Sequence, residues 1–212
     1  MRVFHPALLL ACLLGSAASD AQLLKLRHSK TQTTRVAVQI GDIVEIDVYS
    51  RLDSLETSGL AFYVSFPEGP FEIVDTRQYI VGVQPFAPGT LFREGAVMNN
   101  SLVRNSDVLG PERQWLEYAV VLGPSTRAEK NNGVVASFAL RCVKAADWTD
   151  IQIDDMPIRE TRLVLPDGVS ERQFTKIEGL EIRVADEEIG DGRALTAAPE
   201  RTWGQVKSGE KN

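Results

Sequence analysis

Few residues in this 212-residue chain have the chemistry of a nucleophilic or zinc-dependent site. The chain holds two histidines, His5 and His28, and two cysteines, Cys12 and Cys142. A Ser-His-Asp or Cys-His site needs a histidine beside its nucleophile, and a zinc site needs several His or Cys ligands. The sequence also lacks the Gly-rich patterns of phosphate-binding loops. We therefore expect no site of any of these kinds.

Paired carboxylates are the remaining route to catalysis. Glycoside hydrolases place two carboxyl groups about 5 to 9 Å apart across a groove. Glu45 and Asp47 are two residues apart and so share one face of a strand, and Glu117 could face them from another strand. Charged residues on the solvent face of an alternating strand are the ordinary pattern, which favours a protein that is not an enzyme.

Acidic residues could in principle also hold calcium through their oxygen atoms. The candidates are Asp154, Asp155 and the run 186–191. That run lacks the spacing of an EF-hand loop, and a solvated linker is the simpler interpretation. The sequence therefore predicts no metal and no other cofactor.

Exposed aromatic side chains could serve a different purpose, since a row of them stacks on sugar rings. Alternation along their strands places Tyr49 and Tyr63 on outward faces, and Trp115 and Trp148 are further candidates. Four tyrosines and three tryptophans are a small supply for such a surface. Carbohydrate binding therefore stays open beside protein binding.

Composition limits the partners and the size of the domain. With 43% hydrophobic and 25% charged residues, the chain is of ordinary globular type and long enough to bury a core. Its net charge of −6 argues against nucleic acid, because phosphate binding needs a basic surface.

The first 21 residues have the pattern of a signal peptide. Arg2 and His5 precede an apolar run, Ala7–Leu14, which is followed by small residues up to Ala21. We expect cleavage and an extracytoplasmic protein, whether secreted, periplasmic or at the cell surface. Lipid anchoring at Cys12 is disfavoured because the apolar run continues beyond it. No later stretch is long and apolar enough to predict a transmembrane segment.

Cleavage of that segment would leave Cys142 as the single cysteine of the mature chain. One cysteine cannot form an intramolecular disulfide. By alternation Cys142 shares a strand face with Phe138 and Leu140. We therefore interpret it as a buried thiol that packs as a small hydrophobic side chain.

Residues 34–185 have the pattern of an all-β domain. Short runs rich in Val, Ile and Phe alternate with Gly, Pro, Asn and Asp, as they do in antiparallel sandwiches and barrels. Within such runs Val44, Ile46 and Val48 should point inward, as should Phe62 and its alternate neighbours. The nine predicted strands are 34–40, 43–49, 60–66, 71–75, 115–122, 133–143, 151–153, 162–165 and 180–184.

Two flanking segments are expected to lie outside this domain. Residues 22–33 are mostly polar and predict a flexible leader. Residues 186–212 begin with an acidic, Gly-containing stretch and predict a linker into a disordered tail. An alternative is that Trp203 and Val206 anchor a short recognition segment in that tail.

The strand sequences resemble those of bacterial cohesin-like domains. Gly41–Val48 (GDIVEIDV) is similar to the opening strand of that family, and Gly59–Phe66 (GLAFYVSF) to its second strand. Pro67–Asp75 and Gly133–Leu140 (GVVASFAL) are similar to later strands. The resemblance covers about residues 34–185.

This resemblance implies a nine-stranded antiparallel β-sandwich of jelly-roll topology, in the carbohydrate-binding-domain-like superfamily. Cohesins bind dockerin modules and assemble extracellular enzyme complexes on polysaccharides. The resemblance assigns no functional residue, because its motifs are strand patterns. We expect an exported, non-catalytic binding module for a protein, dockerin-type or other, or for a polysaccharide. The alternatives are a structural subunit of an envelope or secreted assembly and a jelly-roll glycoside hydrolase.

Overall fold

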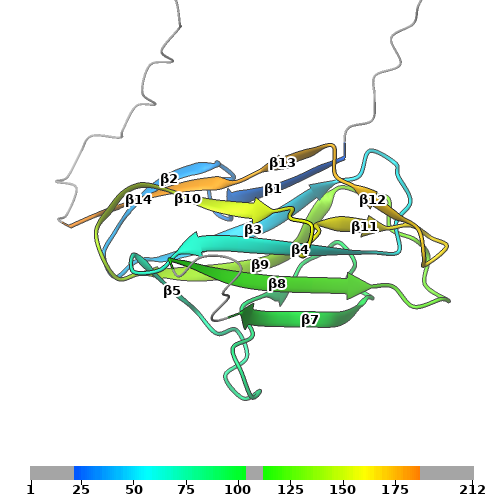
Figure 1. Ribbon diagram of the computed structural model, residues 1–212, viewed down its shortest axis with the longest axis horizontal. Coiled ribbons are helices and arrows are strands. Elements are labelled where there is room, and N and C mark those ends of the chain that lie inside the picture. The colour runs from blue at the N-terminus through cyan, green and yellow to red at the C-terminus, as the bar shows by residue number, and fades with distance from the viewer. Residues whose placement is uncertain (1–21, 104–111, 187–212) are drawn as a thin grey trace, which may run out of the picture.

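Two β-sheets packed face to face form the part of the chain that the computed structural model describes, residues 22–103 and 112–186 (Figure 1). This part contains fourteen strands and no helix. The prediction of an all-β sandwich is therefore confirmed. No helix among the described residues meets the length and apolarity that a membrane span requires.

The first sheet is centred on β3 and β9. These strands pair antiparallel, with Ile43 opposite Arg141 at one end and Ser50 opposite Gly133 at the other. β1 lies on the other side of β3, and β5 and β6 lie on the other side of β9. The strands, in sheet order, are β13 (Lys176–Glu178), β1 (Leu23–His28), β3 (Ile43–Arg51), β9 (Gly133–Cys142) and β5 (Phe71–Ile73), with β6 (Ala87–Pro88) also on β9.

The second sheet is centred on β4 (Gly59–Pro67), which pairs with β8 along its whole length. Its opposite edge is shared: β11 pairs with residues 59–61 and β10 with residues 63–65. The connection between β10 and β11 must therefore turn beside the middle of β4. The other strands of this sheet are β2 (Arg35–Gln39), β7 (Ala96–Val103), β8 (Arg113–Val121), β10 (Ala146–Asp154), β11 (Arg162–Val164), β12 (Glu171–Gln173) and β14 (Leu180–Ala185).

The core between the sheets follows the predicted alternation. Val44, Ile46 and Val48 of β3 are buried, and so are Phe62 and its alternate neighbours on β4. At the centre lie four aromatic rings whose neighbouring centroids are 5.3–5.4 Å apart, in tilted and edge-on arrangements. These rings belong to Phe62, Phe86, Tyr118 and Phe138.

The prediction of a flexible leader at residues 22–33 is wrong, because this segment contains β1. β1 pairs antiparallel with β3 and parallel with β13. Leu24 and Leu26 are fully buried between the sheets. His28 ends this strand, where its Nδ1 lies 2.8 Å from the hydroxyl of Thr31. Residues 22–33 are therefore part of the folded domain, since Leu24 and Leu26 contribute to its core.

All nine predicted strands coincide with strands of the structure, and five further strands were not predicted. These five are β1, β6, β7, β12 and β13. Two strand pairs, β1–β13 and β2–β14, are parallel, which departs from a wholly antiparallel sandwich. The predicted signal peptide, which includes Cys12, and the predicted tail beyond Asp186 lie outside the described residues.

Candidate functional site

The structure separates the carboxylates that could have formed a glycosidase pair. Glu45 and Asp47 lie on the outer face of the first sheet, because the alternate residues of β3 point into the core. Glu117 lies on the outer face of the second sheet, since its neighbours Leu116 and Tyr118 are buried. These faces are on opposite sides of the sandwich, so the three carboxylates do not line one groove.

Internal contacts engage Asp47 and Tyr49 on the outer face of the first sheet. Asp47 Oδ1 accepts hydrogen bonds from the hydroxyls of Ser29 (2.7 Å) and Ser137 (3.0 Å). The Arg27 guanidinium lies 3.6 Å from the other oxygen of Asp47 and 4.0 Å from the ring centre of Tyr49. Tyr49 therefore stacks on an arginine and does not offer a free platform to a sugar.

The outer face of the second sheet carries a cluster that brings together three of the candidate residues, Glu117, Tyr63 and Trp115, with two that the sequence did not indicate, Arg159 and Asn99. Arg159 forms an ion pair with Glu117, and its guanidinium lies 5.8 Å from the ring centres of both Tyr63 and Trp115. Asn99 donates a hydrogen bond of 2.8 Å to the second oxygen of Glu117. We call these five residues the Arg159 cluster. Trp115 is almost completely buried, although this side chain lies on the outward face of β8.

Trp148, the fourth aromatic candidate, lies apart from the cluster and remains partly exposed. The Arg35 guanidinium is 3.8 Å from its ring centre and forms an ion pair of 2.9 Å with Glu181. The structure therefore does not bring the four predicted aromatic side chains into one row.

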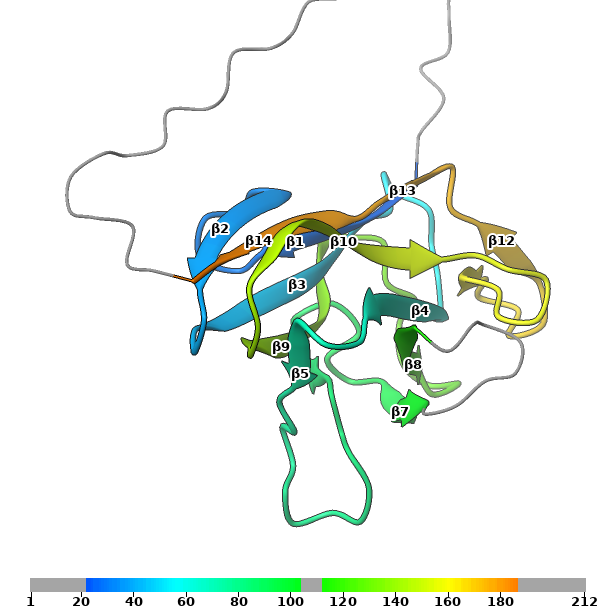
Figure 2. The same cartoon turned by 60° about the vertical axis from the view of Figure 1, so that its left-hand side comes forward.

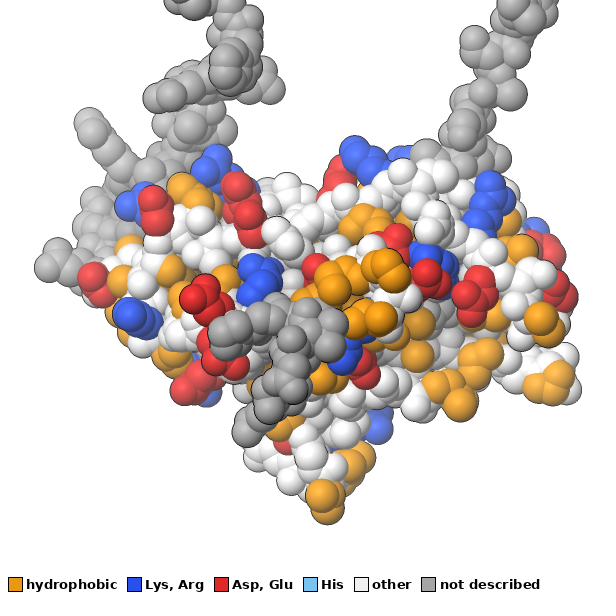
Figure 3. Space-filling model, in the orientation of Figure 1, with side chains coloured by type: hydrophobic (Ala, Val, Ile, Leu, Met, Phe, Trp, Pro, Cys, Tyr) orange, Lys and Arg blue, Asp and Glu red, His pale blue; other side chains and the backbone are white. Residues whose placement is uncertain are grey.

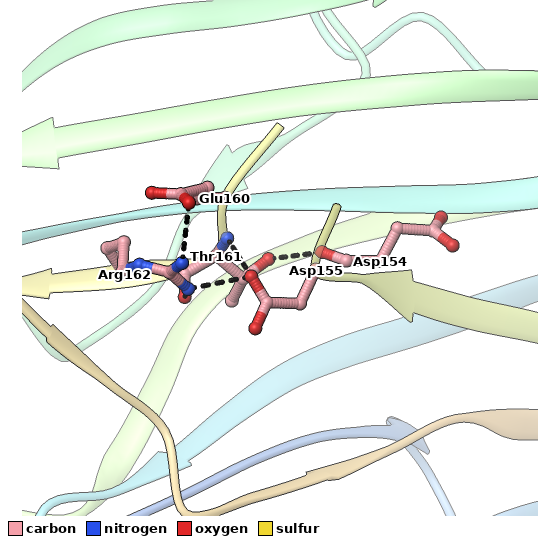
Figure 4. A network of polar contacts seen from close by, with 5 residues as sticks. All are labelled: Asp154, Asp155, Glu160, Thr161 and Arg162. Carbon is pink, nitrogen blue, oxygen red and sulfur yellow. Dashed lines mark hydrogen bonds and ion pairs between the residues drawn. The ribbon is translucent and has the colours of Figure 1, made fainter. Parts of the chain in front are cut away.

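Arg159 reaches the sheet from an arch, which we define as residues 155–161 between β10 and β11. Figure 4 shows the polar network that closes its base. Asp155 accepts hydrogen bonds from the backbone N–H of Thr161 (3.1 Å) and from Arg162 (2.7 Å), and Thr161 donates its hydroxyl to the carbonyl of Asp154 (2.5 Å). Arg162 also forms an ion pair of 2.9 Å with Glu160. Asp155 is thus engaged within the protein.

The top of the arch is a tight turn that presents one apolar side chain. Met156 and Arg159 exchange backbone hydrogen bonds of 3.1 and 2.8 Å, which leaves Pro157 and Ile158 as the two turn residues. Proline fixes its own φ and so stiffens the turn. The Ile158 side chain is 60% exposed, whereas Arg159 folds back onto the sheet. The arch therefore holds an isoleucine rigidly above the sheet.

A groove of about 320 Å³ runs beside the arch. Ala61 and Tyr63 of β4 line it, and so do Pro157 and Ile158 of the arch. The remaining lining residues are Glu160, Arg162, Val164 and Glu171. In the same orientation as Figure 1, the space-filling view shows hydrophobic side chains gathered over the middle of β4 and β8 (Figure 3). The groove thus combines apolar surface with charged groups of both signs.

Two buried polar atoms on this side of the sandwich have no hydrogen-bond partner among the described residues. They are the indole Nε1 of Trp115 and the Oδ2 of Asp154. Burial raises the pKa of the Asp154 carboxyl, and a hydrogen bond from Ser65 and the charge of Arg113 oppose that rise. Within the described ranges, no group of three or more His, Cys, Asp or Glu side chains could hold a metal ion.

Cys142 is a packed thiol, as its strand position predicted. It is fully buried and free. Burial, with a smaller contribution from the charge of Asp42, raises the pKa of this thiol to about 11. The thiolate needed by a nucleophile is therefore strongly disfavoured at neutral pH.

Comparison with known proteins identifies the fold. No protein-family model matches the sequence, and no curated protein is similar to it. Among solved structures, a type II cohesin domain from the cellulosome of Acetivibrio cellulolyticus has a TM-score of 0.55 at 14% identity, over 76% of this chain and 95% of that one. A non-cellulosomal cohesin from Archaeoglobus fulgidus has a TM-score of 0.52 at 8% identity, over 78% and 92%.

A third similar structure is the third ScaC cohesin from A. cellulolyticus, solved in complex with the ScaB dockerin. It has a TM-score of 0.51 at 11% identity and covers 77% of this chain and 98% of its own. These identities are too low to transfer a function. The structural similarities nevertheless confirm the predicted jelly-roll sandwich, and we conclude that the chain has a cohesin-like fold.

Proposed function

We propose that the protein is an exported, non-catalytic binding module that docks a partner protein on the groove beside the arch. The observation that carries this proposal is the exposed Ile158, held in a hydrogen-bonded turn beside a groove that Ala61 and Tyr63 of β4 line. The fold supports it, because structures with this fold include a cohesin bound to a dockerin. The export step depends on residues 1–21 acting as a signal peptide.

The arch has the physical properties of a binding anchor. A side chain already fixed in its bound position loses little conformational freedom on association, so more of its burial contributes to affinity. Contacts that dominate protein interfaces are apolar side chains at the centre, surrounded by polar groups that exclude water. Ile158 has such a surround in Glu160, Arg162 and Glu171, which line the same groove.

A dockerin-type module is the partner class that the fold favours, and a polysaccharide is the second candidate. The structure supports the polysaccharide less, because Tyr49 is covered by Arg27, and Tyr63 and Trp115 lie against Arg159. Flat sugar rings need an open aromatic face, and these three rings do not provide one together.

Binding of the processed chain, Gln22–Asn212, tests the proposal. The immobilised chain would be exposed to the secreted proteins of its own host and to a panel of polysaccharides. We expect capture of a specific protein, which Ile158→Asp should weaken at least tenfold, because burying an isoleucine is worth about 1.5–3 kcal/mol. Ile43→Asp is the matched control, since Ile43 is an exposed isoleucine of β3 in the other sheet.

Three results would contradict the docking face. Equal loss of capture in the Ile158 and Ile43 variants would show that the groove is not specific. Loss of capture on deletion of residues 187–212 would favour a structural subunit that assembles through its tail. Retention on a polysaccharide without any captured protein would make the protein a carbohydrate-binding module.

A further inference from the structure

A second exposed apolar feature stands apart from the groove. The connection between β5 and β6 extends away from the body of the sandwich, as both ribbon views show (Figures 1 and 2). Its outer end carries three consecutive apolar residues, Tyr79, Ile80 and Val81, which we call the tip. Tyr79 is 85% and Val81 99% exposed, and Ile80 is exposed as well. Single exposed apolar residues are ordinary, but three in a row at a protruding point indicate a contact surface.

Hydrogen bonds hold the two sides of this loop together below the tip. Asp75 accepts from the backbone N–H groups of Arg77 (2.9 Å) and Gln84 (3.1 Å). Thr76 donates its N–H (3.0 Å) and its hydroxyl (2.6 Å) to the carbonyl of Gln84. A turn bond of 2.9 Å from the N–H of Ile80 to the carbonyl of Arg77 shapes the outer end.

The loop is also anchored to the core. Phe86 is fully buried among the central aromatic rings. Asn100 holds its backbone on both sides, accepting from the Phe86 N–H (3.0 Å) and donating to the Phe86 carbonyl (2.8 Å). The tip is therefore attached to a rigid base, which lowers the entropy that is lost when it binds.

The segment of the chain that contains the tip carries no negative charge. The chain has 29 acidic residues, yet residues 76–93 contain none, and their only charged side chains are Arg77 and Arg93. A surface that enters an apolar medium must not carry carboxylates with it, because removing an ionised carboxylate from water is very costly. The tip can therefore be buried without desolvating a negative charge.

We propose that the tip inserts into the interfacial region of a phospholipid bilayer. A bilayer accepts a narrow, convex apolar point, and insertion to about 5–10 Å is sufficient for an interfacial contact. A protein interface of ordinary size needs a patch of about 800 Å² with a polar rim, which a projecting three-residue tip does not offer. Tyrosine suits this position because its ring is apolar and its hydroxyl stays in the polar layer.

Flotation with vesicles tests this inference on the processed chain, Gln22–Asn212. We expect the chain to float with zwitterionic phosphatidylcholine vesicles at millimolar lipid, and to do so equally at 0.1 and 0.5 M salt, because the contact is apolar. The double variant Tyr79→Ser/Val81→Ser should lower the partition coefficient roughly a hundredfold, at roughly tenfold for each apolar side chain removed. Its stability to urea should be unchanged, since neither residue is part of the core.

Val169→Ser is the matched control, because Val169 is 84% exposed on a different turn. It should leave flotation unchanged, and so should Ile158→Asp, which separates this inference from the docking groove. The inference is wrong if the parent chain does not float, if salt abolishes flotation, or if the control lowers it as much as the tip variant does. Loss of a captured protein in the tip variant, without flotation of the parent, would assign the tip to a protein partner instead.

Discussion

The ion pair between Arg159 and Glu117 should stabilise the fold more than an ordinary surface pair does. Their side chains are only 18% and 19% exposed, and Asn99 and two aromatic rings complete their surroundings. The perturbation is a double-mutant cycle with Arg159→Gln, Glu117→Gln and both together. Such a cycle isolates the interaction of the two charges from the other effects of each substitution.

The expected magnitude follows from this partial burial. Exposed ion pairs contribute about 0.2–1 kcal/mol, and removing one partner of a buried pair costs about 3–5 kcal/mol. A pair at one-fifth exposure lies between these limits, so each single variant should lose about 2 kcal/mol in the free energy of unfolding, with a coupling of about 1–2 kcal/mol. For a domain of this size, that loss lowers the Tm by about 4–8 °C.

Urea unfolding followed by far-UV circular dichroism at pH 7 measures the coupling. The pair Arg35–Glu181 is the control, because it is also an Arg–Glu ion pair beside an aromatic ring but its side chains are 51% and 45% exposed. Its coupling should be at most about 0.5 kcal/mol and should fall in 0.5 M salt. Equal coupling for the two pairs would refute the argument that partial burial strengthens the Arg159 cluster.

Two further predictions concern buried titratable groups. Because burial raises the folded-state pKa of Asp154, its carboxyl favours the folded state at low pH, and this contribution is lost as the pH rises through that pKa. In urea unfolding, the free energy of unfolding of Asp154→Asn relative to that of the parent should therefore rise between pH 3 and pH 7. A difference between the two proteins that does not change with pH would contradict this. The pKa of about 11 for Cys142 predicts that a thiol reagent at pH 8 labels it only when the protein unfolds. Labelling that is fast in native buffer and independent of urea would disprove the packed-thiol assignment.

Alternation along single strands was enough to predict much of this fold. The inward faces of β3 and β4 follow from Val44, Ile46 and Val48 and from Phe62 and its neighbours, because a strand buried on one face has a period of two. β1 was missed because its buried leucines stand in a polar segment. Only its pairing with β3, beyond the intervening β2, and with β13, which is distant in sequence, makes it part of the core.

The candidate site could not be predicted in the same way. The arch is an irregular connection, and local turn residues such as Asp155 and Pro157 do not reveal which strand it crosses. Arg159 meets Glu117 because β10 and β11 share one edge of β4 while β8 occupies the other. That arrangement depends on strand order, which alternation does not determine. The same strand order placed Glu45 and Glu117 on opposite faces, so their apparent complementarity in the sequence had no counterpart in space.

Hydrogen–deuterium exchange on the complex with a captured partner tests the docking face most directly. We predict that binding slows exchange at the arch, residues 155–161, and at residues 59–63 of β4 beneath the groove. Exchange on the first sheet, in residues 23–28 and 43–51, should be unchanged. Slower exchange confined to the first sheet or to residues 187–212, with the arch unaffected, would contradict the proposal that the groove beside Ile158 binds the partner.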